Sequence, residues 1–292
     1  MPEKLKIYTV TNNFFSSIKD FLGEIGDVEL LPQDWEKNKE FKADLIVFTG
    51  GEDIDPSMYG NDGKPRGSSR DRWEMHVLNS ILNEKLKTKK VLGICRGLQL
   101  INVGMGGTLI PDIWDKFKEE HKSIHELSYR KVSIFNWLTT VNSMHHQGLE
   151  RFGQIGQNSI KYPINVLATE SRTGVAEIVL WGNMFLGFQF HPEFFSKENP
   201  SKKKISEQLL EWVTGKAEII PGQSSKRSMS EDEAKKKYEG FFVSAPEQES
   251  RVFAQFTTAI GDVYPTFPGI RTTDTGRIQF NATENNEEEN DG

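Results

Sequence analysis

An alternation of short β-rich runs with helical patterns is the feature that most constrains this fold. The runs KLKIYTV, ADLIVFTGG and KKVLGIC each precede a helical pattern, over residues 14–25, 70–87 and 96–105 respectively. Within these runs, LIVF and VLGI are continuously apolar, which is typical of parallel strands covered by helices on both faces. The sequence therefore predicts an α/β fold with a mixed, mostly parallel central sheet flanked by helices.

The second half of the chain has a different texture. After about residue 120, the runs RKVSIF, NVLAT, AEIVLW and FLGFQF are short, β-rich and separated by turn residues, which predicts more antiparallel pairing. A helical pattern, KKKISEQLLEWVTG, then closes the domain near Gly215. We interpret its Lys202–Lys204 cluster as a solvated helix start rather than a phosphate site.

The composition changes again beyond residue 215. We expect a globular domain over 1–215, a polar linker over 216–240, and an extension of unknown role over 241–280 that regains aromatic and β-branched residues. The acidic stretch 281–292 is expected to be a disordered tail.

The overall composition excludes several classes of protein. The 292 residues contain one cysteine, so neither an internal disulfide nor a zinc site built on several thiolates is available. The net charge of -6 gives no overall attraction to nucleic acid. No apolar run approaches the length of a membrane span, and the N-terminus lacks the apolar segment of a secretory signal. We expect a cytoplasmic protein whose partners are small substrates or other proteins.

The single cysteine occupies a distinctive position. In GICRG, Cys95 lies between two glycines, directly after a predicted strand and before a predicted helix. This pattern is typical of a nucleophile elbow, in which small neighbours permit a sharp turn and the helix N-terminus favours the thiolate. The alternative is that Cys95 is a small buried hydrophobe.

Two further segments complete a candidate site. In GFQFHPEFF a strand ends in His191, Pro192 and Glu193, where a histidine can take the thiol proton and a carboxylate can orient its ring. In FTGGEDIDPSMYG a buried strand ends in a glycine pair whose amides can approach a ligand closely, although an ordinary glycine turn is equally consistent. Neither phosphate-loop pattern is present.

Together these segments resemble the class I glutamine amidotransferase-like superfamily, which has a flavodoxin-like fold, and within it the gamma-glutamyl hydrolase branch that includes gamma-glutamyl-gamma-aminobutyrate hydrolases. The resemblance covers residues 5–214. It rests on GGEDIDPSMYG, RDRWE, GICRGLQLINVGMGGTL, VNSMHHQG and GFQFHPE, in that order. GICRG and the DPxxYG loop favour the hydrolase branch.

The resemblance implies specific roles for residues. It implies a triad of Cys95, His191 and Glu193, with main-chain oxyanion donors at or near Gly51 and Arg96, and no cofactor. It further implies that a second group of residues builds the substrate pocket: Arg70, Asp71, Gln99, Ser143, His145, His146 and Gln147. For His145 and His146 we expect no metal role, because no carboxylate lies at ligand spacing in the sequence.

Some features depart from the family pattern. YRKVSIF leads almost directly into VNSMHHQG, where the family often has a longer stretch with a His-x-Val element, and Pro111 stands where glutamine is common. The chain after 215 has no counterpart that we recognise. The amine half of the substrate is therefore not specified by the resemblance.

Three functional classes follow from these observations. The first is a cysteine-dependent hydrolase of gamma-glutamyl amides that acts through a glutamyl thioester. The second is a glutaminase subunit that delivers ammonia to a separate synthetase, docked through residues 216–292. The third is a non-catalytic interaction protein on the same scaffold, which the retention of all three triad residue types disfavours.

Overall fold

The computed structural model describes residues 4–60, 67–118, 124–153 and 161–220, together with the backbone of 270–272 and 278–280. The expected linker beyond residue 220, most of the extension and the acidic tail lie outside the described residues.

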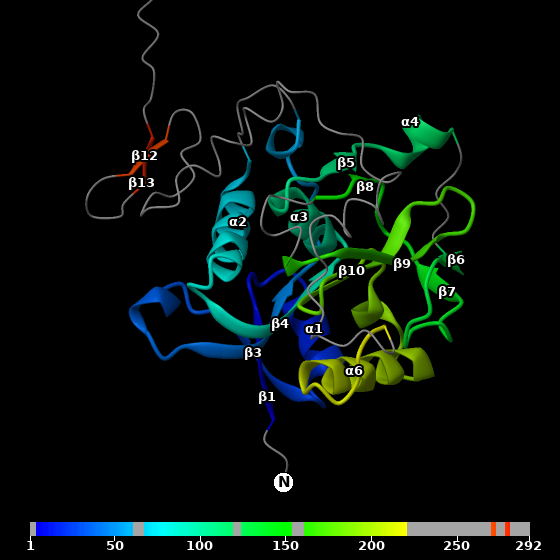
Figure 1. Ribbon diagram of the computed structural model, residues 1–292, viewed down its shortest axis with the longest axis horizontal. Helices are drawn as coiled ribbons and strands as arrows, with labels where there is room; N and C mark the ends of the chain where they lie inside the picture. The colour runs from blue at the N-terminus through cyan, green and yellow to red at the C-terminus, as the bar shows by residue number, and fades with distance from the viewer. Residues whose placement is uncertain are drawn as a thin grey trace, which may run out of the picture.

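A nine-stranded sheet forms the centre of the molecule, in the order β2-β1-β3-β4-β11-β10-β9-β6-β7 (Figure 1). From β2 to β11 neighbouring strands pair in parallel, and from β11 to β7 they pair in antiparallel. This confirms the predicted mixed sheet, parallel at one end. The strands of the parallel part are β1 (Leu5–Thr9), β2 (Gly26–Leu30), β3 (Lys42–Phe48), β4 (Lys87–Ile94) and β11 (Phe185–Phe188).

The antiparallel part contains the strands of the second half of the chain. They are β6 (Ile124–Tyr129), β7 (Thr140–Asn142), β9 (Ile164–Glu170) and β10 (Ala176–Trp181). Two short ribbons lie apart from this sheet in the pairing order: β5 (Thr108–Ile110) with β8 (Gly148–Arg151), and β12 (Ile270–Thr272) with β13 (Ile278–Phe280).

Helices cover the two faces of the sheet through separate apolar clusters. One cluster joins α1 (Phe15–Leu22) and α6 (Pro200–Val213) to the sheet, and the other joins α2 (Ser69–Leu82) and α3 (Arg96–Gly104) to the opposite face. Because both faces are buried, β3 and β4 need the continuous apolar runs seen in the sequence. The remaining helices are short: α4 (Ile113–Phe117) and the 3₁₀ turns η1 (Trp35–Lys37), η2 (Pro56–Met58) and η3 (Pro192–Phe194).

Three details differ from the sequence prediction. Strand β2 was not predicted, and RKVSIF is not a strand, since the actual strand β6 ends at Tyr129. The hydroxyl of Tyr129 donates to the carbonyls of Phe135 and Leu138, which holds the following segment as a turn. The core also continues past residue 215, because Ile219 is buried and its carbonyl accepts a hydrogen bond from Ile134. A domain boundary soon after this point remains a prediction.

Among the described residues, no helix combines the length and apolar character that crossing a membrane would require.

Candidate active site

The predicted site residues converge at the carboxyl ends of the parallel strands. Cys95 directly follows β4, His191 lies shortly after β11, and the glycine pair Gly50 and Gly51 follows β3. These three strands are adjacent in the sheet, so their ends meet at one edge, which is where open α/β sheets place ligands.

Cys95 occupies a strained backbone conformation. Its φ of 52° and ψ of -107° lie in a region that residues with a side chain rarely adopt. The turn is held by its amide, which donates to the carbonyl of Phe188, and by the helix α3 that begins at the next residue. This is the geometry of a nucleophile elbow, with the helix N-terminus directed toward the thiol.

Close packing explains the two glycines that flank Cys95. A Cβ on Gly97 would lie 2.1 Å from the carbonyl oxygen of Phe48, and one on Gly93 would lie 2.6 Å from the backbone of Gly97. The first turn of α3 therefore lies directly against β3 and β4, which only glycine permits.

His191 is buried and fixed on several sides. Its Nδ1 lies 2.7 Å from Oε1 of Glu193, which leaves Nε2 for the thiol. The ring stacks on Phe194 with centroids 4.9 Å apart and meets the edge of Phe14 at 5.9 Å. Gly50 supports it from another direction, since a Cβ there would lie 2.5 Å from the imidazole.

The electrostatics around His191 favour its charged form. Burial lowers the pKa of His191, but the hydrogen bonds and charges of Cys95 and Glu193 outweigh burial and raise the pKa to about 10. The imidazolium is therefore the stable form at neutral pH, beside the thiol it is expected to serve.

The Arg70 side chain holds the glycine loop in place. Its guanidinium donates to the carbonyls of Thr49 and Gly50 and pairs with Glu52 at 2.8 Å and Glu74 at 3.0 Å. Gly51 has a φ of 143°, and a Cβ on it would lie 2.1 Å from Nη1 of Arg70. Arg70 thus contacts the expected oxyanion loop itself.

The Arg96 side chain is directed away from the reacting edge. Its guanidinium is buried and pairs with Asp71 and Glu74 on α2. Asp71 also closes the capping box of α2, accepting from the amide of Ser68 at 2.7 Å. Asp71 therefore joins two helices, while the amide of Arg96, the first residue of α3, has no acceptor within its helix.

The segment 143–147 meets the loop after β3. His146 pairs with Asp53 at 2.8 Å, and the Gln147 amide lies 3.5 Å from the carbonyl of Ile54 and 3.4 Å from the hydroxyl of Tyr59. Two motifs some 90 residues apart thus form one surface. Ser143 is buried, and its hydroxyl makes no hydrogen bond within the described residues.

Gln99 lies in a buried chain of amides. Its Nε2 donates to the carbonyl of Gln147 at 3.1 Å and to Oε1 of Gln189 at 3.2 Å. Gln189 in turn directs its Nε2 at the sulfur of Cys95, 3.7 Å away. Gln189 was not predicted as a site residue, although its position two residues before His191 on the same extended segment was a usable signal.

Two further side chains hold the backbone of residues 191–193, and the sequence analysis assigned this role to neither of them. The side chain of Asn142 both donates to the carbonyl of His191 and accepts from its amide, each at 2.8 Å. Lys202 donates to the carbonyl of Glu193 at 3.1 Å and pairs with Asp20 at 2.8 Å. The interpretation of Lys202 as solvated is wrong, because its side chain is buried against this segment.

The two adjacent histidines have different surroundings. His146 is exposed, whereas the His145 ring lies in the interior beside His125 of β6 and Glu177 of β10. The sequence argument found no carboxylate near His145, but the fold supplies Glu177. Burial raises the pKa of Glu177, yet the imidazoles of His125 and His145 outweigh it and hold that pKa below its ordinary value.

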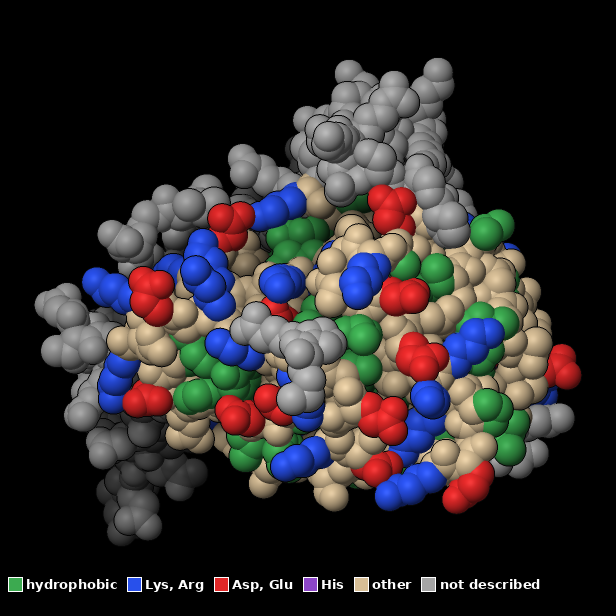
Figure 2. Space-filling view, turned by 90° about the horizontal axis from the view of Figure 1, so that it is seen from below, with side chains coloured by type: hydrophobic (Ala, Val, Ile, Leu, Met, Phe, Trp, Pro, Cys, Tyr) green, Lys and Arg blue, Asp and Glu red, His purple; other side chains and the backbone are tan. Residues whose placement is uncertain are grey.

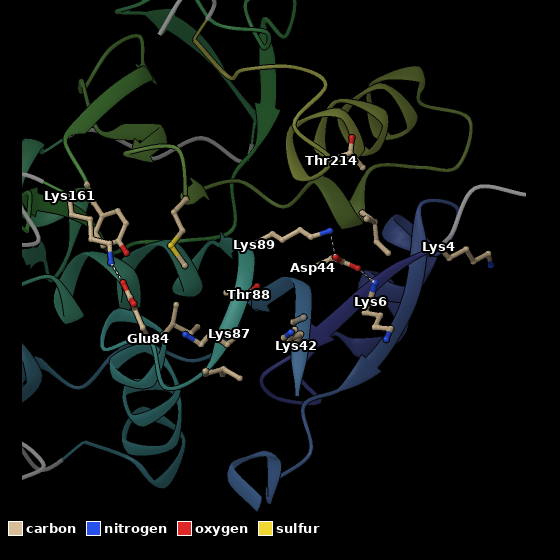
Figure 3. Close-up of a pocket in the computed structure, with 16 residues that line it drawn as sticks. Lys4, Lys6, Lys42, Asp44, Glu84, Lys87, Thr88, Lys89, Lys161 and Thr214 are labelled. Atoms are coloured by element: carbon tan, nitrogen blue, oxygen red, sulfur yellow. Dashed lines mark hydrogen bonds and ion pairs between the residues drawn. The ribbon is translucent and has the colours of Figure 1, made fainter. Parts of the chain in front are cut away.

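A cavity of about 740 Å³ lies at the other end of the parallel strands, away from Cys95 (Figure 3). Its lining comes from the amino ends of β1, β3 and β4 and includes Lys6, Lys42 and Lys87. It contains none of the predicted site residues. On the face seen in Figure 2, basic and acidic side chains are interspersed over the surface.

Comparison with known proteins identifies the family. The Peptidase C26 family model matches residues 10–193. The chain belongs to this family. A glutamine amidotransferase-like protein of Lactococcus lactis subsp. cremoris, the YvdE homologue, is 35% identical over 158 residues, which is 47% of this chain and 82% of that protein.

Two more distant matches extend the comparison, one in sequence and one in fold. Gamma-glutamyl-gamma-aminobutyrate hydrolase PuuD of Escherichia coli K12 is 25% identical over 193 residues, 58% of this chain and 71% of that protein. The crystal structure of a GMP synthase subunit from Thermoplasma acidophilum superposes with a TM-score of 0.52 at 19% identity, covering 74% of this chain and 97% of that one. The fold is that of the class I glutamine amidotransferases, as the sequence predicted.

Proposed function

We propose that this C26 protein hydrolyses gamma-glutamyl amides through a thioester on Cys95. The observation that carries the proposal is the strained elbow at Cys95 beside a histidine that is bonded to Glu193. A nucleophile, a proton carrier and an orienting carboxylate are the parts that such acyl transfer needs. A purely structural cysteine would not require a left-handed backbone.

The proposed reaction has two halves. The Cys95 thiolate attacks the carbonyl carbon of the gamma-glutamyl amide, and the amides of Gly51 and Arg96 donate to the oxyanion. The His191 imidazolium protonates the departing nitrogen, leaving a glutamyl thioester and a neutral imidazole. A water molecule, deprotonated by His191, then attacks the thioester carbonyl and releases glutamate and the thiolate.

Typical magnitudes indicate how much each group contributes to the reaction rate. One oxyanion donor contributes about 100- to 1000-fold to the rate. Proton transfer by a positioned side chain contributes about 100- to 10,000-fold. The loop that Arg70 supports is thus expected to matter nearly as much as His191. Buried Ser143 is proposed to take a polar group of the substrate, and Arg70, Asp71 and Gln99 to hold the surrounding backbone.

The second candidate is a glutaminase subunit that passes ammonia to a synthetase. The amidotransferase names of the relatives and the likeness to a GMP synthase component favour it. The two candidates share every chemical step and differ only in whether activity needs a partner.

The test is to incubate the full chain alone with glutamine and a panel of gamma-glutamyl amides and to follow released amine and glutamate. The hydrolase proposal expects turnover that disappears in the Cys95→Ala variant. Turnover that appears only after a synthetase is added would favour the ammonia-delivering role. Turnover that is equal in wild type and Cys95→Ala would refute both.

A further inference from the structure

A second buried cluster lies behind the proposed active site. It consists of His125 on β6, His145 in the segment before β8, and Glu177 on β10. Their side chains are at most 2% exposed, and one ligand atom from each lies within 4.8 Å of the others. The three residues come from separate elements, so the fold alone brings them together.

The distances in this cluster suit a metal ion. Oε1 of Glu177 lies 3.1 Å from Nε2 of His125 and 3.7 Å from Nε2 of His145. In a tetrahedral zinc site with bonds of about 2.0–2.1 Å, neighbouring ligand atoms lie about 3.3–3.5 Å apart. The two distances to Glu177 thus differ by a few tenths of an ångström from those around a bound ion, and the ligand atoms of the two histidines lie within 4.8 Å of each other.

The hydrogen bond of His145 fixes which nitrogen faces the carboxylate. Its Nδ1 lies 2.8 Å from the carbonyl oxygen of Gln147, which can only accept, so Nδ1 carries the proton. In the neutral ring Nε2 then presents a lone pair toward the carboxylate of Glu177. A lone pair and a carboxylate that face each other in this way can both coordinate one cation. A backbone carbonyl that orients a histidine in this way is typical of metal ligands.

Glu177 has the properties of an internal ligand. The carboxylate is fully buried, and within the described residues neither oxygen takes part in a hydrogen bond of normal geometry. An ionised carboxylate is not kept in the interior without compensation. The two imidazoles beside it supply part of this compensation, and a divalent ion bound by them and by one or both carboxylate oxygens would add to it.

From this geometry we propose that His125, His145 and Glu177 bind one divalent transition metal ion, zinc being the best match to two imidazoles and a carboxylate. The ion would have a structural role, with the second oxygen of Glu177 or a water molecule as its fourth ligand. The Gln147 carbonyl that orients His145 also accepts from Gln99, whose amide contacts Gln189, and Gln189 contacts Cys95. A bound ion would thus also stabilise the buried amides that connect His145 to Cys95.

The experiment measures metal content rather than turnover. The full chain, without a histidine tag, is stripped with chelator, and zinc is then titrated by elemental analysis after gel filtration. Cobalt(II) binding is followed by its visible absorption. We expect about one equivalent per chain, with the absorption of tetrahedral cobalt.

Four variants separate this cluster from other ligands. His145→Gln should weaken binding by at least about 100-fold, whereas His146→Gln, the exposed neighbour, should bind as wild type. Cys95→Ala should also retain binding, which excludes the thiol as a ligand. Glu177→Gln repeats the test with a nearly isosteric side chain, and circular dichroism checks the fold of each variant.

Absence of stoichiometric zinc and cobalt binding in wild type would overturn the proposal, as would unchanged binding in His145→Gln. If Glu177→Gln does not fold, the comparison of His145→Gln with His146→Gln still decides. Because no substrate is involved, the result is independent of whether the hydrolase proposal is right.

Discussion

Two buried histidine–glutamate clusters in this protein have different arrangements: His191 with Glu193, and His125 and His145 with Glu177. His191 and Glu193 are two residues apart and share a 2.7 Å hydrogen bond through Nδ1, so that Nε2 remains for the thiol. At the other cluster, Nε2 of His125 and Nε2 of His145 both approach a single oxygen of Glu177. In our proposals, the first arrangement leaves one nitrogen of His191 to transfer protons during the reaction at Cys95, whereas the second directs two nitrogens at one buried carboxylate that together bind an ion. A histidine and a carboxylate in contact therefore do not define a function; the direction of the remaining nitrogen does.

The largest expected difference between the two clusters is in their effect on turnover. His191→Gln should reduce kcat/KM by about 100- to 10,000-fold, because the variant loses both the acid and the base of the reaction. His125→Gln, compared per folded molecule, should reduce it less than about 10-fold, since His125 contacts no reacting group; for a secondary support of this kind the expected loss is small. Steady-state kinetics on the best gamma-glutamyl amide measure both. A similar loss in the two variants would show that the two clusters are not functionally distinct.

Next in size is the expected effect at the glycine loop. Gly51→Ala should lower kcat by about 100-fold or more, because a side chain is strained at a φ of 143° and collides with Arg70, displacing an oxyanion donor. Gly174→Ala is the matched control, since Gly174 also has a positive φ, of 74°, but open space around its Cα. Equal activity of Gly51→Ala and wild type would show that the glycine loop does not contribute to catalysis.

The raised pKa of His191 predicts a pH dependence of stability. A group whose pKa is about 10 in the folded state and about 6.5 when unfolded stabilises the fold fully below pH 6.5. This contribution is lost as the pH rises toward 10. The free energy of unfolding of wild type should therefore fall relative to that of His191→Gln over this range, by on the order of a few kcal/mol. Denaturant titrations at several pH values test this, and parallel curves for the two proteins would contradict it.

The smallest effect is expected at Asn142. Removing its two hydrogen bonds to the His191 backbone in Asn142→Ala should lower kcat about 10-fold and reduce stability by about 1–3 kcal/mol. Asn142→Asp keeps the acceptor and loses the donor, so it should lie between Ala and wild type. Kinetics and thermal unfolding of the three proteins provide the series, and a wild-type kcat in Asn142→Ala would show that this clamp does not position His191.

The sequence predicted the proposed catalytic edge far better than the second cluster, for a physical reason. Cys95, His191 and the glycine loop each follow a recognisable strand, and the carboxyl ends of parallel strands meet at one edge whatever the exact register. His125, His145 and Glu177 meet through antiparallel strands, whose register and order cannot be read from an apolar pattern alone.

Support residues were also hard to predict, because their roles depend on burial. Lys202 belongs to a run of three lysines that is typical of a solvated face, and only the packing of α6 against the Glu193 segment buries its side chain. Arg70 and Asp71 were expected to line the substrate pocket, and the structure shows them holding backbone and helix ends. Their direct contact with substrate remains a prediction.

The most direct test of the central claim is to trap the acyl-enzyme. The full chain is mixed with a gamma-glutamyl amide, quenched in acid within milliseconds to seconds, digested, and examined by mass spectrometry. The account predicts a glutamyl group in thioester linkage on the peptide that carries Cys95, with none in His191→Gln at the same times. Turnover of the substrate with no adduct on that peptide at any time, in a protein whose Cys95→Ala variant remains active, would contradict it.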